Sequence, residues 1–432
     1  MSIKNNQKYI LTAWLMCGLG ALFYAYEYLL RISPSVMEPS LRNHFNLSAT
    51  GFGLLSAVYY YAYVPMQLPV GVLMDRFGPR RLLTIACLIC VIGALMFADT
   101  NKFAVAGIGR FLVGIGSAFA FVGVLKLATI WLPEDKLGMV AGLTAALGTI
   151  GAMFGDNVLG GMVVRSGWQL TINYTAFFGV VLTLILWFCI HDHKRDDKSG
   201  GTINSFKKNM LDLGIILREK QIWINGMYGC LVYLPTTVFA ELWGIPYFRN
   251  AHGLSQLDAG FANSLLFFGF MIGAPLMGLI SDKIKRRKLP MQVGAMGAAV
   301  VMMLILYVPG LERSALYTLV FLLGLFYSAQ AIVFAVGREL SPIEAAGTAI
   351  AITNMIVMIG AMFLQPLVGR LLDWSLSTHG SLAALDHQTV DKMEQLYAAV
   401  DYQLALSIIP AGIVIAAILI CFIRETHAHA GR

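Results

Sequence analysis

The sequence predicts an all-α membrane protein with twelve transmembrane helices in two pseudo-symmetric six-helix bundles. Three observations predict this fold class. Apolar residues make up 58% of the 432 residues and charged residues only 13%, about half the charged share of a soluble protein. The apolar residues fall in runs of about 20, the length of helix that crosses a bilayer. A segment of glycine, aspartate and basic residues at the end of one run recurs half a chain later.

Polar or charged segments separate twelve apolar runs, each long enough to form a spanning helix. The first run is longer than a signal peptide and lacks a small-residue cleavage site, so we expect it to remain as a helix. The predicted spans are residues 10–30, 50–72, 82–99, 103–128, 138–164, 168–190, 222–248, 256–280, 289–309, 314–337, 346–372 and 402–423.

A polar, glycine-containing and charged segment divides the twelve runs into two sets of six. It includes the stretch HDHKRDDKSGGTINSFKK, a composition typical of a solvated linker. We therefore predict one bundle at residues 1–190, a linker loop at 191–221 and a second bundle at 222–432.

Two sequence repeats indicate that the bundles are related. Asp75 lies in a charged turn after the second span, and Asp282 lies in a weaker copy of that turn 207 residues later. The fifth and eleventh spans share Ile-Gly-Ala-Met-Phe, at 150–154 and 359–363, an offset of 209. The two turns read Gly71-Val-Leu-Met-Asp75-Arg76-Phe-Gly78-Pro-Arg80-Arg81 and Gly278-Leu-Ile-Ser-Asp282-Lys-Ile-Lys-Arg-Arg287.

Basic residues are distributed unevenly between the two sides of the predicted membrane. Twelve spans put both termini on one side, and 21 of the 31 Lys and Arg residues fall on that side against eight on the other. This bias predicts that both termini are cytoplasmic. The net charge of +7 is thus explained by topology and not by nucleic-acid binding. The same residues are suited to contact anionic lipids on the cytoplasmic side of the bilayer.

The charged turns resemble the signature between the second and third helices of the major facilitator superfamily, and the resemblance extends over nearly the whole chain. It implies a carrier whose two halves, related by an axis along the membrane normal, enclose a substrate near the middle of the membrane. It also implies that the residues of the turns belong to the conformational switch and not to the substrate pocket. These are Gly71, Asp75, Arg76, Gly78, Arg80, Gly278 and Asp282.

Charges within the first six spans predict where a proton or a charged solute is handled. A charge in a span costs at least ~2.5 kcal/mol, so each needs a partner or a water-filled cavity. Counting ~1.5 Å per residue places Glu27, Arg110 and Asp156 at similar depths in the outer half of the membrane. We expect Arg110 to lie within reach of Asp156 or Glu27 in at least one state. The alternative is that Arg110 and Asp156 form a purely architectural ion pair.

The helix 4 stretch from Arg110 to Gly116 also resembles the superfamily, in which helices 1, 4, 7 and 10 line the cavity. With that resemblance, we predict Glu27 and Asp156 as proton-coupling residues. The predicted substrate-binding residues are Arg110, Glu27, Tyr60, Glu241, Gln330 and Asn354. For Glu241 the alternative is an acid that reaches water at the outer interface. For the amides and for Tyr60 the alternative is contact with another helix or with the interface.

Several patterns that would indicate other functions are missing from the sequence. No histidine lies in a predicted span, so a carboxylate must carry any coupled proton. The sequence shows neither a nucleophile paired with a base nor a cluster of metal ligands. We therefore predict no enzyme activity, no bound metal and no other cofactor. The sequence contains no phosphate-binding loop, so direct use of ATP is not predicted. Drug exporters of the superfamily carry a Gly-Pro pair in helix 5, where this chain has Gly155 and Asp156.

We therefore predict a monomeric, proton-coupled symporter of the inner membrane that moves a small polar metabolite by alternating access. An amino acid, a nucleoside, a sugar and an organic acid are all possible substrates. Two alternatives are a proton-driven exporter and a membrane sensor or receptor that transports nothing. The stretch from Tyr26 to Met37 also resembles bacterial nutrient permeases of the phagosomal-transporter type, which implies amino acids or nucleosides.

Overall fold

The computed structural model describes residues 3–133, 136–191, 214, 216–342, 345–379 and 397–427, with side chains from residue 10 onward. Within these ranges every regular element is a helix. Most of the predicted linker 191–221 lies outside the described residues.

The described residues of the first half form six long helical segments. The first, α1 (Ile3–Val36), is followed by a short helix, α2 (Glu38–Phe45). The fifth segment is continuous but has a π-helical insert, η2. The remaining segments are α3 (Ala49–Phe77), α4 (Pro79–Ala98), α5 (Phe103–Trp131), α6–η2–α7 (Leu137–Phe154, Gly155–Leu159 and Gly160–Ser166) and α8 (Trp168–Cys189).

The second half forms six more segments, and they are more interrupted. The first of them contains a nine-residue π-helix, η3, between two α-helices. The segments are α10–η3–α11 (Lys220–Val232, Pro235–Trp243 and Gly244–His252), α12 (Gln256–Ile284), α13 (Lys288–Tyr307), α14–η4–α15 (Arg313–Tyr327, Ser328–Ala331 and Ile332–Glu339), α16 (Ala346–His379) and α17–α18–η8 (Ala399–Leu406, Ile408–Leu419 and Ile420–Phe422).

These segments confirm the predicted fold class, and each matches one predicted span. Ten of them are long and apolar enough to cross a membrane by length and composition alone. The two others are α3, which holds a tyrosine run and Gln67, and α10–η3–α11, which is broken into shorter pieces. The outer surface is apolar, with Phe177, Phe188 and Leu279 each more than two-thirds exposed, as expected of side chains that face lipid.

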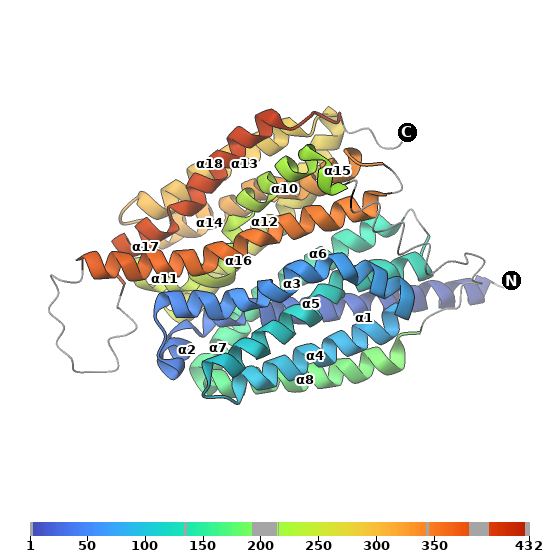
Figure 1. The fold of residues 1–432 in the computed structure, drawn as a ribbon, viewed down its shortest axis with the longest axis horizontal. Helices are drawn as coiled ribbons and strands as arrows, with labels where there is room; N and C mark the ends of the chain where they lie inside the picture. The colour runs from blue at the N-terminus through green and yellow to red at the C-terminus, as the bar shows by residue number, and fades with distance from the viewer. Residues whose placement is uncertain are drawn as a thin grey trace.

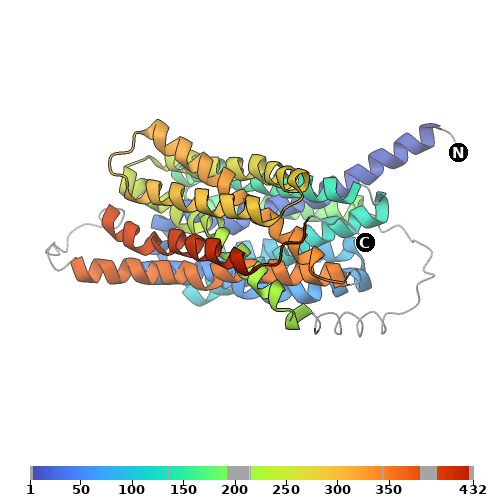
Figure 2. The same cartoon turned by 90° about the horizontal axis from the view of Figure 1, so that it is seen from above.

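The helices of each half lie together, and the chain termini lie at the same end of the molecule. Figure 1 shows the segments up to α8, blue to green, below those from α10 onward, and it shows both termini on the right. Figure 2 shows the same helices running side by side along the long axis, with the start of α1 extending beyond them. The superposition of residues 1–190 on 222–432 remains a prediction.

Glycines bring the two halves into contact at the end opposite the termini, which we call the far end. An added Cβ on Gly53, near the start of α3, would overlap the Gln365 carbonyl of α16. An added Cβ on Gly260 of α12 would overlap the backbone oxygen of Asp156 in η2. Small residues allow such backbone approach between membrane helices. The halves are therefore packed backbone to backbone at the far end.

Turns between segments use residues suited to them. Gly78 has a φ of 78° at the end of α3, and Pro79 is the first residue of α4. Only glycine adopts that backbone conformation without strain, and proline fits the first turn of a helix because its missing N–H has no helical partner there. The predicted charged turn is thus a tight connection between α3 and α4.

Candidate functional site

A cluster of charged side chains is buried where the two halves meet. Glu27 and Arg31 come from α1, and Glu241 comes from η3 in the other half. Their exposed fractions are 0%, 2% and 1%. An Arg31 Nη2 atom lies 2.9 Å from Glu27 Oε1, and Nη1 lies 3.8 Å from Glu241 Oε1. A single guanidinium therefore holds two carboxylates from opposite halves.

Two adjacent tyrosines of α3 complete the polar contacts of this cluster. Arg31 Nε donates to the Tyr59 hydroxyl at 3.0 Å, and that hydroxyl donates to Glu27 Oε2 at 3.0 Å. The Tyr60 hydroxyl donates to Glu241 Oε2. Neighbouring residues on a helix point in different directions. Tyr59 therefore contacts Glu27 and Arg31 of the first half, whereas Tyr60 contacts Glu241 of the second.

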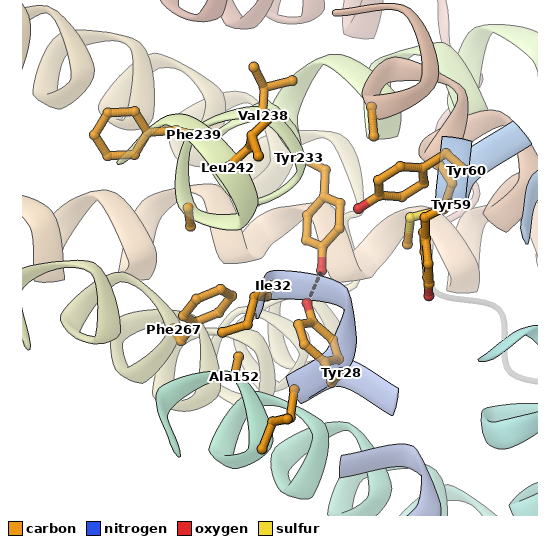
Figure 3. Packing of buried hydrophobic residues seen from close by; sticks show 14 of the residues in the cluster. Tyr28, Ile32, Tyr59, Tyr60, Ala152, Tyr233, Val238, Phe239, Leu242 and Phe267 are labelled. Atoms are coloured by element: carbon orange, nitrogen blue, oxygen red, sulfur yellow. Dashed lines mark hydrogen bonds between the residues drawn. The ribbon is translucent and has the colours of Figure 1, made fainter. Parts of the chain in front are cut away.

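Aromatic rings surround the Arg31 guanidinium. Its central carbon lies 4.5 Å from the ring centre of Tyr28 and 5.0 Å from that of Tyr63, within the range of cation–π attraction. The Tyr28 hydroxyl lies 3.4 Å from the hydroxyl of Tyr233, the residue that follows α10, and the pair is drawn in Figure 3. The charged cluster is thus enclosed by rings from both halves.

Arg110 takes a different position from the one we expected. Its Nη1 donates to the Leu30 carbonyl at 2.8 Å and its Nη2 to the Arg31 carbonyl at 3.2 Å. Pro34 lies within α1 and has no N–H to donate to Leu30, four residues earlier. Ser33 Oγ also donates to the Leu30 carbonyl, at 2.9 Å, so Arg110 and Ser33 together replace the missing backbone donor of α1. In this conformation neither Glu27 nor Asp156 is hydrogen-bonded to Arg110 among the described residues.

Asp156 lies in η2 and contacts the other half. It is fully buried, and Asn263 Nδ2 of α12 donates to its Oδ2 atom at 2.8 Å. The next residue, Asn157, donates to Ser264 Oγ at 2.6 Å. Two neighbouring polar contacts therefore join η2 to α12. The predicted pairing of Asp156 with Arg110 is not present in this conformation.

The other predicted pocket residues are partly brought together. Glu241, for which the sequence offered no cationic partner in its own span, pairs with Arg31 of the other half, so the interface alternative for this acid is wrong. Asn354 Nδ2 of α16 donates to Gln67 Oε1 of α3 at 3.2 Å. Gln330 is 2% exposed in η4. Roles for these residues in binding a substrate remain predictions.

The predicted switch residues lie at the end of the molecule that holds the chain termini, away from the charged cluster. Asp75 Oδ1 lies 2.6 Å from Lys126 Nζ of α5. In the second half, Arg287 pairs with two carboxylates. Its Nη1 atom lies 2.5 Å from Asp282 Oδ1, and its Nη2 atom lies 2.6 Å from Glu339 Oε1. Arg80 Nε donates to the Trp187 carbonyl at 3.0 Å, and Arg76 lies over the Phe77 ring. Gly71 and Gly278 face open space, so no close helix approach requires them here.

Glu425, near the end of the described chain, caps α13 beside this network. Its carboxylate accepts hydrogen bonds from the backbone N–H of Arg287 at 2.7 Å and of Lys288 at 3.1 Å. Partial burial raises the pKa of this carboxyl, but the N–H donors of Arg287, Lys288 and His427 outweigh burial and place the pKa below its ordinary value. A negative charge at a helix N-terminus is favourable.

Sequence reasoning missed three residues of these contacts. They are Arg31, Tyr59 and Asn263. The spacing of Glu27 and Arg31, four residues apart, was a usable signal because such residues are neighbours on a helix face. Within the described residues, no three His, Cys, Asp or Glu side chains gather as metal ligands.

Comparison with known families and proteins gives a consistent result. The family model described as Major Facilitator Superfamily matches residues 15–365. The uncharacterized transporter YybO of Bacillus subtilis is 25% identical over 58% of this chain, and the match spans 60% of that relative, less than two-thirds. The probable sulfoacetate transporter SauU of Cupriavidus necator is 23% identical over 64% of this chain and 67% of its own. The probable galactarate/D-glucarate transporter GudP of Escherichia coli is 24% identical over 66% and 68%.

Solved structures share the fold over nearly the entire length. A bacterial homologue of the human lysosomal transporter Spinster, in an inward-facing and unoccupied conformation, aligns with a TM-score of 0.75 at 16% identity, covering 95% of both chains. The D-xylose–proton symporter aligns with a TM-score of 0.72 at 16% identity, covering 98% of this chain and 100% of its own. At this identity the likeness concerns the fold alone.

Proposed function

The chain belongs to the major facilitator superfamily, and from that premise we propose that it is a proton-coupled symporter of a small organic acid. The observation that carries the proposal is the buried cluster in which Arg31 holds Glu27 and Glu241 from opposite halves. Because those side chains are at most 2% exposed, a solute reaches them only when the halves separate. That requirement supports transport by alternating access.

The contacts of Arg31 suggest how proton and substrate binding are coupled. In this conformation the guanidinium is already engaged by two acids and by Tyr59. A third carboxylate, brought by a substrate, adds a buried negative charge without a new cation, which is costly. A proton on Glu27 removes one negative charge and frees donors of Arg31. Substrate anion and proton therefore bind favourably together, which is the requirement for symport.

An organic acid is favoured over the other solutes by two features. Arg31 is a buried cation, and a guanidinium group freed from an acid binds a carboxylate through paired hydrogen bonds. Arg110 is a second buried cation next to the Arg31 backbone, and its Nε atom has no hydrogen-bond partner among the described residues. The solutes in the names of SauU and GudP, sulfoacetate and galactarate or glucarate, all carry a carboxylate. Tyr60, Glu241, Gln330 and Asn354 are proposed to contact the polar remainder of the solute.

The excess of basic residues on one side supports an inner-membrane protein with both termini in the cytoplasm. The charged turns, with Asp75 and Asp282 paired to Lys126 and Arg287, then lie on the cytoplasmic side. We propose that these turns stabilise the closed cytoplasmic end in one state of the transport cycle and release it in another. They also lie next to anionic lipid headgroups.

A binding screen on the purified protein tests the substrate class. Carboxylates, their amides, neutral sugars and amino acids are added at equal concentration, and the unfolding temperature is measured. A solute at 100 times its Kd stabilises the protein by about 2.7 kcal/mol. We expect a carboxylate to stabilise the chain and its amide to have no effect. A neutral sugar as the sole stabilising solute contradicts the organic-acid proposal.

Uptake by reconstituted vesicles tests the mechanism with the identified solute. Glu27→Gln is expected to abolish accumulation driven by a pH gradient while counterflow exchange continues, because only the proton step is removed. Arg31→Gln is expected to abolish both. Arg165→Gln, which alters an exposed arginine of the same half, is the matched control. Solute that enters the vesicles while protons leave them indicates an exporter, because solute and protons then move in opposite directions. Binding of the solute without any transport indicates a sensor.

A further inference from the structure

At the contact between η2 and α12, one side-chain oxygen atom on each side has no hydrogen-bond partner among the described residues. Asp156 Oδ2 accepts from Asn263 Nδ2 at 2.8 Å, but Asp156 Oδ1 and Asn263 Oδ1 are both buried and have no hydrogen-bond partner within the described chain. Both atoms are acceptors when the aspartate is ionised. Unpaired buried acceptors are rare in folded proteins and call for an explanation.

Among the described residues, no cation is paired with Asp156. It is 0% exposed, and the side chains that contact its carboxyl group, Asn263 and Ser264, are both neutral. The elements packed around Asp156 are α1, α6, α7, α12 and η3. In the described part of the chain, no ionisable group on these elements is ion-paired or hydrogen-bonded to the Asp156 carboxyl group. Helix α6 has no ionisable residue. The described ionisable groups on the other elements are Cys17, Tyr24, Tyr26, Glu27, Tyr28, Arg31, Arg165, Asp258, Asp282, Lys283 and Glu241.

We propose that Asp156 carries a proton in this conformation and that its Oδ1–H group donates to Asn263 Oδ1. The acid and the amide then form a reciprocal pair, with Asn263 Nδ2 donating in one direction and Asp156 Oδ1 in the other. One proton satisfies both unpaired atoms and removes the uncompensated charge. The proton comes from water on the far side when the halves are apart, and it returns to water when the pair breaks.

The reciprocal pair makes the closure of the far end depend on protonation. Asn263 also donates to the Ala240 carbonyl at 2.9 Å, next to Glu241 in η3, so the pair is linked to the charged cluster. Gly260 lets the backbones approach closely enough for the pair to form. Loss of the proton leaves a buried carboxylate between two packed halves, and burying such a charge without a cation is expensive. The deprotonated protein therefore separates at the far end.

This inference extends the proposed proton-coupled function, but it is tested without substrate or transport. Probes are attached to cysteines introduced at Lys102 and Glu312, exposed residues that precede α5 and α14 at the far end. The exposed native Cys189 and Cys421 are replaced in this background. The distance between the probes is measured in detergent over a range of pH, and the fraction of molecules with the far end closed is the readout.

We expect the closed fraction to fall as pH rises. Asp156→Asn, which keeps an uncharged partner for Asn263, is expected to remain closed at every pH. The exchanged pair, Asp156→Asn with Asn263→Asp, is expected to regain the pH dependence because it restores one acid facing one amide. Gln256→Ala, which removes a neutral contact between α12 and the Val36 carbonyl of α1, is the matched control and is expected to lower the closed fraction equally at all pH values.

A pH dependence in Asp156→Asn equal to that of the unaltered protein overturns the proposal. Infrared spectroscopy provides a second test on the unaltered protein. The carbonyl stretch of a protonated carboxylic acid is expected in its spectrum at neutral pH, and this band is expected to disappear in Asp156→Asn. An identical carboxylic-acid band in both proteins also overturns the assignment. Failure of solute uptake to require protons contradicts the proposed function but leaves both of these readouts unaffected.

Discussion

Arg110 shows how one side chain can be placed by a backbone defect in a neighbouring helix. Pro34 leaves the Leu30 carbonyl of α1 without its helical donor, and Arg110 donates to that carbonyl at 2.8 Å. Ser33 Oγ donates to the same carbonyl at 2.9 Å. In a membrane this carbonyl has no water to accept from, so the two side chains together replace the donor that the proline lacks. The proline of α1 and the cation of α5 are thus linked.

We predict that Arg110→Met destabilises the protein by about 1–3 kcal/mol, measured as a lower unfolding temperature in detergent. In a Pro34→Ala background the same substitution is expected to cost less, because the alanine supplies the N–H that the proline lacks. The two single variants and the double variant form a thermodynamic cycle, and a coupling energy near zero contradicts the repair of α1 by Arg110.

The sequence predicted Arg110 within reach of Glu27 or Asp156 in at least one state, and in this conformation it donates to the α1 backbone instead. Counting residues gives depth along a helix, but it does not give the direction in which each side chain points. That direction depends on helix rotation and on the π-helical inserts, which shift the register of η2 and η3. Those inserts have no recognisable sequence signal here. The pairing of Arg31 with Glu241 could not be predicted because it joins residues 210 positions apart in different halves.

Helix packing in the first half depends on glycines that admit a neighbouring backbone. An added Cβ on Gly114 of α5 would overlap the carbonyl oxygen of Tyr59 in α3. Tyr59 is hydrogen-bonded to Glu27 and Arg31. The α3–α5 contact therefore sets the position of the charged cluster as well as the stability of the bundle.

Gly114→Ala is expected to lower stability by about 1–3 kcal/mol through overpacking and to weaken solute binding by displacing Tyr59. Gly107→Ala, on the same helix with nothing within 4 Å of the added Cβ, is the matched control and is expected to be neutral or slightly stabilising. Thermal unfolding and solute-induced stabilisation measure the two effects. Equal behaviour of the two variants would show that the close approach is not needed.

The cap on α13 gives a pH dependence whose sign follows from the pKa of Glu425. That pKa lies below the ordinary value because backbone N–H donors outweigh burial. A carboxyl with a lower pKa in the folded state stabilises the protein at pH above its unfolded value, and this contribution is lost as pH falls through the folded value.

Glu425→Gln is expected to lower the unfolding temperature near pH 7 and to have a smaller effect near pH 4, where the unaltered carboxyl has begun to lose its charge. Glu312→Gln is the matched control, since Glu312 precedes α14 without a side-chain capping bond. A loss of stability from Glu425→Gln that is the same at both pH values rules out the capping charge as its cause.

At the scale of the whole molecule, composition and repeats carried most of the prediction. Runs of about 20 apolar residues give spanning helices because the bilayer fixes their length, and every predicted span corresponds to a described helical segment. Two spans do not meet a criterion of helix length and hydropathy. The segment α10–η3–α11 is broken into shorter pieces, and α3 carries a run of tyrosines, of which Tyr59 and Tyr60 are buried and do not face lipid.

The contacts of the candidate site were less predictable because they join the two halves. Each half was predicted from patterns within a single helix, whereas Tyr28 with Tyr233, Arg31 with Glu241 and Asp156 with Asn263 are partners only in the assembled molecule. Their identity depends on how the halves dock. The same dependence explains why these contacts are suited to report on alternating access.

Proton movement during solute uptake tests the central proposal most directly. Vesicles containing the purified protein, with equal pH inside and outside and with the membrane potential clamped, receive the carboxylate found in the binding screen. We predict that the weakly buffered external solution becomes more alkaline as the solute enters, and that Glu27→Gln vesicles show no such change. Solute entry without proton movement, or with acidification outside, would contradict proton symport by this chain.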